Sequence, residues 1–347
     1  MSANIGCYHL AKIKTVEIQR GVYEITRGEG IPSFEMKIHM GETPETIAYE
    51  APVAMMHEDP VTHIVVPEPD KRYYFAYASA DGLRIITADR RVLMDGALNF
   101  RDMGGYETLD GRVLKWGRLF RSDSLVRISD RDQARMTYMG IRKAYDFRTP
   151  DEMTIAPGRY PESVEAVPVP IIHGAKDPKE QFEDMKKGDY SGFDEAFIKS
   201  RYIDMIERFA PEWGKALTAL ADPAGLPAVI HCTAGKDRTG AMAALLLLAL
   251  DVPEKTVVED YLLSNLYIGE RKNEILKRME KFGIDREKAA PGLMAPRSAI
   301  FALLNHLEMN YGSARDYLKR MGGVTDKTFA ELKKNLTTDA KSCGPGM

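Results

Sequence analysis

The segment from Ala228 to Leu250 constrains this chain most, because it joins a short strand, a tight loop and an apolar helix. Val229 and Ile230 are β-branched and follow Pro227, which favours a short buried strand. The run 241–250 is apolar on every side and rich in helix formers, which predicts a buried helix. That run is too short to span a membrane, which takes about 18 or more apolar residues.

The loop between this strand and this helix has the size of a phosphate site. Five residues separate Cys232 from Arg238, so the loop's backbone N–H groups can converge on one tetrahedral anion beside the positive end of the helix. The same field favours a thiolate, which is the nucleophilic form of cysteine. The planar fork of Arg238 can bind two phosphoryl oxygens. The residues predicted to bind phosphate are Thr233, Ala234, Gly235, Lys236 and Arg238.

Read in full, the segment 231–240 is His-Cys-Thr-Ala-Gly-Lys-Asp-Arg-Thr-Gly. It resembles the signature of the cysteine-dependent protein tyrosine phosphatases. The fuller form is similar to a bacterial branch that includes the mycobacterial type B phosphatase and the Listeria lipid and tyrosine phosphatase. Three further blocks are similar to that branch, so the resemblance covers about residues 92–338. The blocks are Asn99-Phe100-Arg101-Asp102-Met103-Gly104-Gly105, Leu119-Phe120-Arg121-Ser122-Asp123-Ser124-Leu125 and Asp146-Phe147-Arg148-Thr149.

The resemblance implies an α/β fold of the cysteine-phosphatase kind, with a central, mostly parallel sheet flanked by helices. The residues agree, because a helix capped by Ser129 precedes a strand over 141–148, and strand–helix–strand order is typical of parallel sheets. Ligands bind at the carboxyl ends of such strands, so Asp146 and Arg148 are expected near Cys232. The alternative for this pair is a salt bridge at the strand end.

Residues 1–90 have a different pattern, in which short alternating strands are separated by glycine and proline turns. This spacing predicts an all-β sandwich of immunoglobulin or fibronectin kind, outside the resemblance. We therefore expect an accessory domain over 1–90, a catalytic domain over 91–340 and a disordered tail over 341–347. Because the β-domain carries no recognisable chemistry, a fragment from about residue 90 is expected to keep activity on small aryl phosphates.

Two aspartates are candidates for the general acid that protonates the leaving oxygen. Asp237 lies inside the loop, and the resembling branch carries an aspartate there where other phosphatases do not, so we favour it. Asp146 fits the separate acid loop of many tyrosine phosphatases, yet it could instead hold Arg238 in place. The predicted catalytic residues are Cys232, Arg238, Asp237 and Asp146.

Other residues are expected to support the site. The Thr239 hydroxyl can stabilise the Cys232 sulfur as a leaving group, and Lys236 can face a second anionic group of a phosphoinositide. Arg101, Asp102 and Arg121 fit either a structural ion-pair network or direct substrate contact. Helices near 253–290 fit either a lid, as in the resembling family, or plain packing. The predicted supporting residues are His231, Thr239, Arg148, Arg101 and Asp102.

Composition narrows the remaining function classes. Net charge is -3, so no nucleic-acid surface is indicated. The three cysteines lie far apart, which argues against a disulfide framework. His, Asp and Glu show no metal-ligand spacing, so we expect neither a metal nor a cofactor.

No segment suits a membrane span or a signal peptide, so we expect a cytoplasmic protein, or an exported one if a signal peptide has been removed. Oligomeric state is not indicated.

The sequence therefore predicts a phosphomonoester hydrolase that works through a cysteinyl-phosphate and acts on a phosphorylated protein or a phosphoinositide. The rival from another class is a catalytically silent module that binds phosphotyrosine or phosphoinositide. A lost cysteine, arginine or acid would indicate that module, and all three are present. Sulfur transfer and arsenate reduction also use cysteine loops. Those reactions usually show a different loop composition or a resolving cysteine nearby, and Cys7 and Cys343 are distant in sequence.

Overall fold

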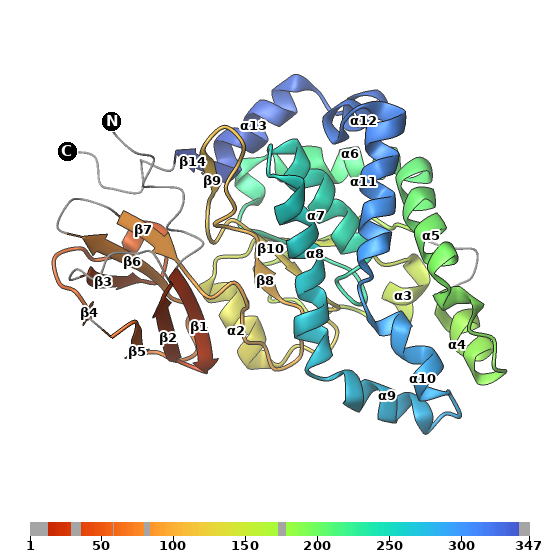
Figure 1. The fold of residues 1–347 in the computed structure, drawn as a ribbon, viewed down its shortest axis with the longest axis horizontal. Coiled ribbons are helices and arrows are strands. Elements are labelled where there is room, and N and C mark those ends of the chain that lie inside the picture. Colours follow the sequence, from red (N-terminus) through yellow and green to blue (C-terminus); the bar gives the residue numbers. More distant parts are fainter. Residues whose placement is uncertain (1–12, 29–35, 58, 80–83, 173–177, 340–347) are drawn as a thin grey trace.

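The computed structural model describes residues 13–28, 36–57, 59–79, 84–172 and 178–339. The tail predicted over 341–347 lies outside these residues. Figure 1 shows a part made of strands beside a larger part in which helices surround a central sheet. We call residues 13–87 the β-unit and residues 91–339 the α/β-unit.

The strands of the β-unit form two antiparallel sheets around one apolar core. They are β1 (Ile13–Gln19), β2 (Val22–Arg27), β3 (Met36–Gly41), β4 (Ala54–Met56), β5 (Val61–Val65), β6 (Tyr74–Ser79) and β7 (Arg84–Thr87). The sheet orders are β1-β2-β5 and β4-β3-β6-β7. Buried residues alternate along β2, and Tyr23 and Ile25 from it pack against Ile38 and Phe75 of the other sheet. The alternating pattern in the sequence therefore reflects burial on one face of each sheet.

The central sheet of the α/β-unit is mostly parallel, as predicted. Its strands are β8 (Arg101–Asp102), β10 (Leu119–Ser122), β11 (Lys143–Asp146), β12 (Glu165–Pro168) and β13 (Ala228–His231). Their order is β12-β11-β13-β10-β8, and the edge strand β8 alone among them pairs antiparallel. Ser122 and Asp146 both lie opposite His231 in register. Three parallel strands thus end together, immediately before the predicted loop. A small separate sheet pairs β9 (Arg112–Leu114) with β14 (Thr337–Asp339).

Helices follow the strands and cover the central sheet (Figure 1). They are α2 (Asp130–Tyr138), α3 (Pro150–Ile155), α4 (Pro178–Lys186), α5 (Glu195–Arg208), α6 (Ala210–Leu220), α7 (Arg238–Ala249), α8 (Glu254–Gly269), α9 (Lys272–Glu280), α10 (Arg286–Ala289), α11 (Arg297–Tyr311), α12 (Ala314–Arg320) and α13 (Asp326–Leu336). Single turns of 3-10 helix lie at η1 (Pro44–Thr46), η2 (Ser191–Phe193), η3 (Pro223–Gly225) and η4 (Ala290–Leu293).

Alternation along β13 separates two cores. Ile230 belongs to the larger apolar cluster, to which α5, α6, α7, α8 and α11 contribute. Val229 points to the other face and packs with Met136 of α2. α7 is buried along almost its whole length, which confirms the buried helix predicted after the loop. This burial fixes the helix whose first turn carries Arg238.

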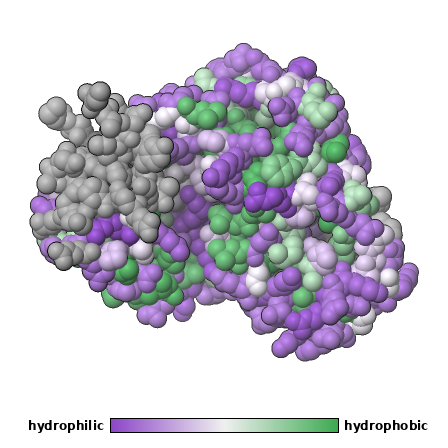
Figure 2. All heavy atoms as spheres, viewed as in Figure 1, coloured by the Kyte–Doolittle hydropathy of each residue, from purple (hydrophilic) through white to green (hydrophobic). Residues whose placement is uncertain are grey.

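Local signals fixed some helix ends well and others less well. The Ser129 hydroxyl accepts a hydrogen bond from the Asp132 N–H, and the Asp132 carboxylate accepts one from the Ser129 N–H. α2 therefore begins at the predicted cap. α8 continues to Gly269, and Tyr267 and Ile268 in its last turn are buried. No helix of the described residues is long and apolar enough to cross a membrane. Figure 2 shows polar residues prevailing around α9 and α10, with apolar ones interspersed near α7 and α8.

Candidate active site

The loop at 232–237 turns sharply between β13 and α7. Gly235 has a φ of 66°, and a Cβ there would collide with the backbone of Ser122 and Asp123. Carbonyl oxygens of the loop are bound: Thr233 O accepts from Ser124 N at 3.1 Å. The backbone N–H groups of residues 233–236 and 238, by contrast, donate to no protein acceptor within the described part of the chain. Those N–H groups are therefore available to an anion at the start of α7.

Cys232 and Thr233, at the start of this loop, differ in exposure. Cys232 is only 2% exposed and forms no disulfide, whereas Thr233 beside it is exposed. The Thr239 hydroxyl is buried and has no hydrogen-bond partner among the described residues. It is therefore not committed elsewhere, which leaves open its predicted role toward the Cys232 sulfur.

His231 precedes the nucleophile and is fully buried. Burial lowers the pKa of His231 to about 4, so its imidazole is neutral at pH 7. The Tyr160 hydroxyl lies 3.0 Å from His231 Nε2 and also donates to Asp146 Oδ2 at 3.3 Å. His231 therefore acts here as a neutral packing and hydrogen-bonding group between two strand ends.

Arg238 is held by Glu152, a residue that the sequence analysis did not single out. Arg238 Nη1 donates to Glu152 Oε2 at 2.5 Å, and Arg238 Nη2 donates to Glu152 Oε1 at 3.0 Å. Burial by itself raises the pKa of Glu152, but hydrogen bonds from Arg238 and its charge outweigh burial and bring that pKa to about 2. The carboxylate is thus ionised at any physiological pH and fixes the plane of the guanidinium.

The hydrogen bonds of the other Arg238 N–H groups determine which donor is available to a ligand. Nη1 also donates to Phe147 O at 3.3 Å, and Nη2 donates to Thr233 Oγ1 at 3.1 Å. Arg238 Nε is buried and has no partner among the described residues. A guanidinium has five N–H donors, so the Nε–H is the uncommitted one. The Thr233 hydroxyl in turn donates to Glu152, which links the loop to the same carboxylate.

A capping box places Glu152. Thr149 caps α3, its hydroxyl accepts from the Glu152 N–H, and Glu152 Oε2 accepts from the Thr149 N–H at 2.8 Å. The pattern Thr-Pro-Asp-Glu was readable in the sequence as a helix start with proline in the first turn. That signal would have located Glu152 on the first turn, but nothing local indicates its contact with Arg238.

Asp146 does lie at the strand end opposite His231, where it was expected, but it does not hold Arg238. Arg148 Nη2 donates to Asp146 Oδ2 at 2.6 Å, and Arg148 Nε lies 3.0 Å from both carboxylate oxygens. Burial raises the pKa of Asp146, but the hydrogen bonds from Arg148 outweigh burial and lower it overall. The interpretation of Asp146 as the partner of Arg238 is corrected: Glu152 fills that place, and Asp146 and Arg148 form a strand-end ion pair.

Asp237 lies inside the loop and is partly exposed. The Tyr202 hydroxyl of α5 donates to Asp237 Oδ1 at 2.7 Å and lies 2.8 Å from the Tyr261 hydroxyl of α8. Arg201 lies 4.0 Å from Asp237 Oδ2. The carboxyl group of Asp237 is thus oriented by helices that pack over the loop.

The Lys236 ammonium lies against the segment that follows α10, and it is also 3.8 Å from Asp237 Oδ2 of the loop. It donates to Gly292 O at 2.5 Å and to Met294 O at 2.8 Å, both in the segment that follows α10. Burial lowers the pKa of Lys236. The Lys236 ammonium is thus bound to two backbone carbonyls, and its role toward a phosphate group stays a prediction.

A buried polar network supports the loop from behind. Asn99 Nδ2 donates to Ala234 O at 3.2 Å and to Gly235 O at 3.0 Å, and Arg121 Nη2 donates to Gly235 O at 2.9 Å. Asp260 of α8 joins Arg121 and Arg101, at 2.5 Å to Arg121 Nη1 and 3.4 Å to Arg101 Nε. Burial raises the pKa of Asp260, yet the two guanidinium groups bring it to about 2.

This network bears on the role of Arg101 and contains two residues that were not predicted. Arg101 is fully buried in ion pairs and hydrogen bonds, which is the structural role and not direct contact with a ligand at the loop. Asp102 pairs not with Arg101 but with Arg72 of the β-unit, at 3.1 Å. Asp260 and Ser264 were missed, because α8 carries them as single polar residues on a buried face.

A cleft of about 670 Å³ opens beside the loop at Thr233. Its walls are the backbone near 95–98, the residues after β10, and α9 with the residue before it. Arg127, Arg271 and Arg278 are its cationic residues. No group of three or more His, Cys, Asp and Glu side chains among the described residues could hold a metal ion.

A parallel sheet whose central strand ends in a Cys-x5-Arg loop at a helix start fits an enzyme of the phosphatase class. The chain belongs to the tyrosine phosphatase family, whose model matches residues 92–338. The β-unit lies outside that match.

Named relatives agree with this assignment. A tyrosine-protein phosphatase of Cupriavidus necator is 28% identical over 74% of this chain and 89% of its own length. The triple specificity protein phosphatase PtpB of Mycobacterium tuberculosis is 29% identical over 69% of this chain and 96% of its own length. A tyrosine-protein phosphatase of Nostoc commune is 26% identical over 62% of this chain and 73% of its own length.

Proposed function

We propose that this chain is a cysteine-dependent phosphomonoester hydrolase that acts on phosphotyrosine through a cysteinyl-phosphate intermediate. The observation that carries the proposal is the loop at 232–238. It brings together a free Cys232, unpaired backbone N–H groups and the uncommitted Nε–H of a fixed Arg238. These are the groups that stabilise a phosphoryl group as it moves between oxygen and sulfur.

The reaction takes two steps. The Cys232 thiolate attacks phosphorus in line, the bond from phosphorus to the leaving oxygen breaks, and an aspartic acid protonates that oxygen. The loop N–H groups and Arg238 bind the equatorial oxygens throughout. Water then attacks phosphorus, the sulfur–phosphorus bond breaks, and the aspartate takes the proton from water. Thr239 supports the departing Cys232 sulfur with its hydroxyl.

The contacts favour Asp237 over Asp146 as the general acid. A general acid must carry a proton before it donates one. Asp146 is clamped by the Arg148 fork and its pKa is lowered, so it is ionised at neutral pH. Asp237 is partly exposed in the loop itself, and the Tyr202 hydroxyl orients it. We therefore assign proton donation to Asp237 and strand-end support to Asp146.

The cleft supports a substrate range that extends to phosphoserine, phosphothreonine and phosphoinositides. Its two aspartates are already engaged: Asp123 accepts from the N–H groups of residues 98 and 99, and Asp95 pairs with Arg20. Glu274 also lines the cleft, where it pairs with Arg271 at 2.8 Å and interacts with the charge of Arg278. Arg127 adds a further cationic side chain to the lining. These cationic side chains suit substrates that carry anionic groups beyond the scissile phosphate.

We also propose a division of the chain into an accessory β-domain over 1–90 and a catalytic domain over 91–340. The two antiparallel sheets with their own apolar cluster support the first part. The family match over 92–338 supports the second.

Turnover of a chromogenic aryl phosphate by Cys232→Ser tests the proposal. A serine hydroxyl is poorly ionised, so we expect turnover below detection, while inorganic phosphate still binds as a competitive ligand of the loop. Retention of about a tenth of parental activity would refute the cysteine mechanism. A parent protein that binds phosphate but turns over nothing would identify a silent binding module. A panel of phosphotyrosine, phosphoserine and phosphothreonine peptides and phosphoinositides then defines the substrate range.

A further inference from the structure

The β-unit and the α/β-unit are joined by two buried ion pairs. Arg72 of the β-unit donates to Asp102 at 3.1 Å, with side chains 4% and 0% exposed. Glu17 of β1 accepts from Arg135 of α2 at 2.9 Å, with side chains 1% and 0% exposed. Charged groups this deeply buried need their partners, because an unpaired buried charge is strongly unfavourable.

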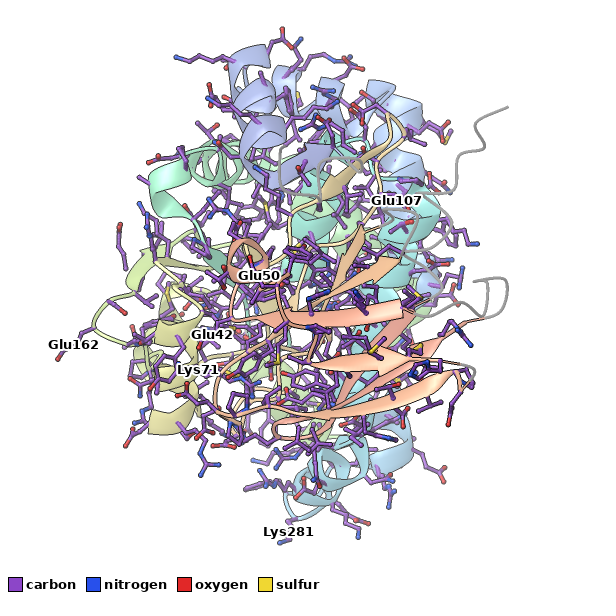
Figure 3. The ribbon with its side chains drawn as sticks, turned by 90° about the vertical axis from the view of Figure 1, so that its left-hand side faces the viewer. Glu42, Glu50, Lys71, Glu107, Glu162 and Lys281 are labelled. Carbon is purple, nitrogen blue, oxygen red and sulfur yellow. The ribbon has the colours of Figure 1, made fainter. Side chains whose placement is uncertain are left out.

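Arg72 is held on several sides. Its Nη2 also donates to Asp89 O at 2.7 Å, and its Nε donates to the Tyr74 hydroxyl at 3.0 Å. The guanidinium lies over the Tyr74 ring at 5.1 Å and over the Phe120 ring of β10 at 5.8 Å. Figure 3 places the neighbouring Lys71 beside Glu42 at the surface, where the two form an ion pair.

Asp102 connects Arg72 to β8, the edge strand of the central sheet. Its carboxylate accepts from Gly104 N and Gly117 N, each at 2.8 Å, in addition to Arg72. These bonds fix the segment after β8 and the segment before β10, and the two strands pair through Asp102 and Arg101. Asp102 thus fixes the backbone from which the preceding side chain, Arg101, extends.

Arg101 connects β8 to the loop. Its Nη1 donates to both the backbone oxygen and the side-chain oxygen of Asn99, and its Nη2 donates to Ser264 Oγ at 3.2 Å. An Asn99 amide whose oxygen is held by Arg101 must turn its Nδ2 the other way, towards Ala234 O and Gly235 O. Binding these carbonyls fixes the peptide planes whose N–H groups face the anion.

We propose that Arg72 is a positioning residue for the phosphatase reaction, so the β-unit is a working part of the active site. It neutralises Asp102, fixes β8, and through Arg101 and Asn99 sets the orientation of the loop peptides. The proposal rests on the proposed function of that loop. It reverses the expectation that a fragment from about residue 90 keeps its activity, because such a fragment leaves Asp102 and Arg135 without their partners.

The second ion pair is a matched control within the same interface. Glu17 also accepts from Gly21 N, and Arg135 also donates to Leu93 O, so this pair anchors β1 to α2. Neither side chain contacts the loop or its supporting network among the described hydrogen bonds. Loss of this pair should weaken the interface without turning the loop peptides.

The experiment compares Arg72→Met, Arg72→Lys and Glu17→Gln in the full chain. Aryl phosphate turnover and competitive inhibition by inorganic phosphate are measured below the thermal midpoint of each variant. Displaced catalytic groups typically cost up to about 100-fold in rate, so we expect Arg72→Met to lose about 10- to 100-fold in kcat and to bind phosphate more weakly. Arg72→Lys should recover part of both. Glu17→Gln should lower the thermal midpoint while kcat and phosphate affinity stay within about twofold.

The double variant Arg72→Met with Asp102→Asn distinguishes a positioning role of Arg72 from a general loss of folded structure. Removing the charge that Arg72 neutralises should restore part of the lost activity, because coupled residues do not add. Equal kcat and phosphate affinity in Arg72→Met and the parent would overturn the proposal, as would equal catalytic losses in Glu17→Gln. If Arg72→Met does not fold, Arg72→Lys carries the same comparison. If the parent turns over no phosphate ester, the proposed function fails, and phosphate affinity alone still tests the positioning role.

Discussion

Replacement of Glu152 by glutamine isolates one charge at the centre of the site. The variant keeps a similar shape and one side-chain oxygen, so it can still accept one hydrogen bond from Arg238. It loses the negative charge that balances a guanidinium whose side chain is only 4% exposed. Glu152 itself is 11% exposed, so water screens the pair little.

The pKa gives the size of the effect. A fall from 4.5 to about 2 corresponds to about 3 kcal/mol of folding stability at pH 7, because one pKa unit is about 1.4 kcal/mol. Since the pKa is lower in the folded state, this contribution is complete above about pH 4.5 and is lost as pH falls towards 2. Glu152→Gln should therefore unfold about 2–3 kcal/mol more easily at pH 7, with a smaller difference at pH 3.

Urea unfolding of the parent and the variant at pH 7 and pH 3 measures this difference. Glu165→Gln is the matched control, because Glu165 pairs with Lys143 at 3.2 Å on the surface and its side chain is 64% exposed. That change should cost less than about 0.5 kcal/mol. A Glu152→Gln effect equal at the two pH values, or no larger than the control, refutes the reasoning. The same variant should also lose about tenfold in kcat/KM, because Arg238 is no longer held in one plane.

Further predictions concern proton transfer and Lys236. Asp237→Asn should slow phosphotyrosine far more than an activated aryl phosphate, within the 10²–10⁴-fold range typical of general acids, and should flatten the alkaline limb of the rate profile. Asp146→Asn should slow both substrates alike, and the opposite pattern would exchange the two roles. Lys236→Ala should reduce turnover of phosphotyrosine and phosphoinositide by similar factors, because its ammonium binds backbone carbonyls. A loss confined to phosphoinositide would place Lys236 against a second anion.

The fold of the α/β-unit was predictable because its signals are local. Val229 and Ile230 mark a buried strand, the run after Gly240 marks a buried helix, and Ser129 marks a helix start. Each follows from a few adjacent residues. The position of Asp146 beside the end of β13 was predictable as well, because neighbouring parallel strands have their carboxyl ends at the same edge of the sheet.

Partners within the site were less predictable, because they depend on contacts across the sequence. Glu152 reaches Arg238 over 86 positions, and Arg72 reaches Asp102 from outside the family match. Neither contact leaves a trace in periodicity or spacing. The sequence placed Asp146 beside the end of β13 but did not indicate that Glu152, and not Asp146, is the partner of Arg238.

The charges around the loop explain where its anion affinity must come from. In the described residues Arg238 is matched by Glu152, while Arg101 and Arg121 share Asp260. The charge of Arg238 is therefore balanced locally, whereas two guanidinium groups against one carboxylate leave one positive charge buried behind the loop, where it attracts an anion without fixing its position. The N–H groups of residues 233–236 and 238, which donate to no acceptor among the described residues, act only on an atom placed at the centre of the loop. Affinity and selectivity for a tetrahedral oxyanion thus depend on the directions of those peptides, which is why the residues that bind their carbonyls matter for catalysis.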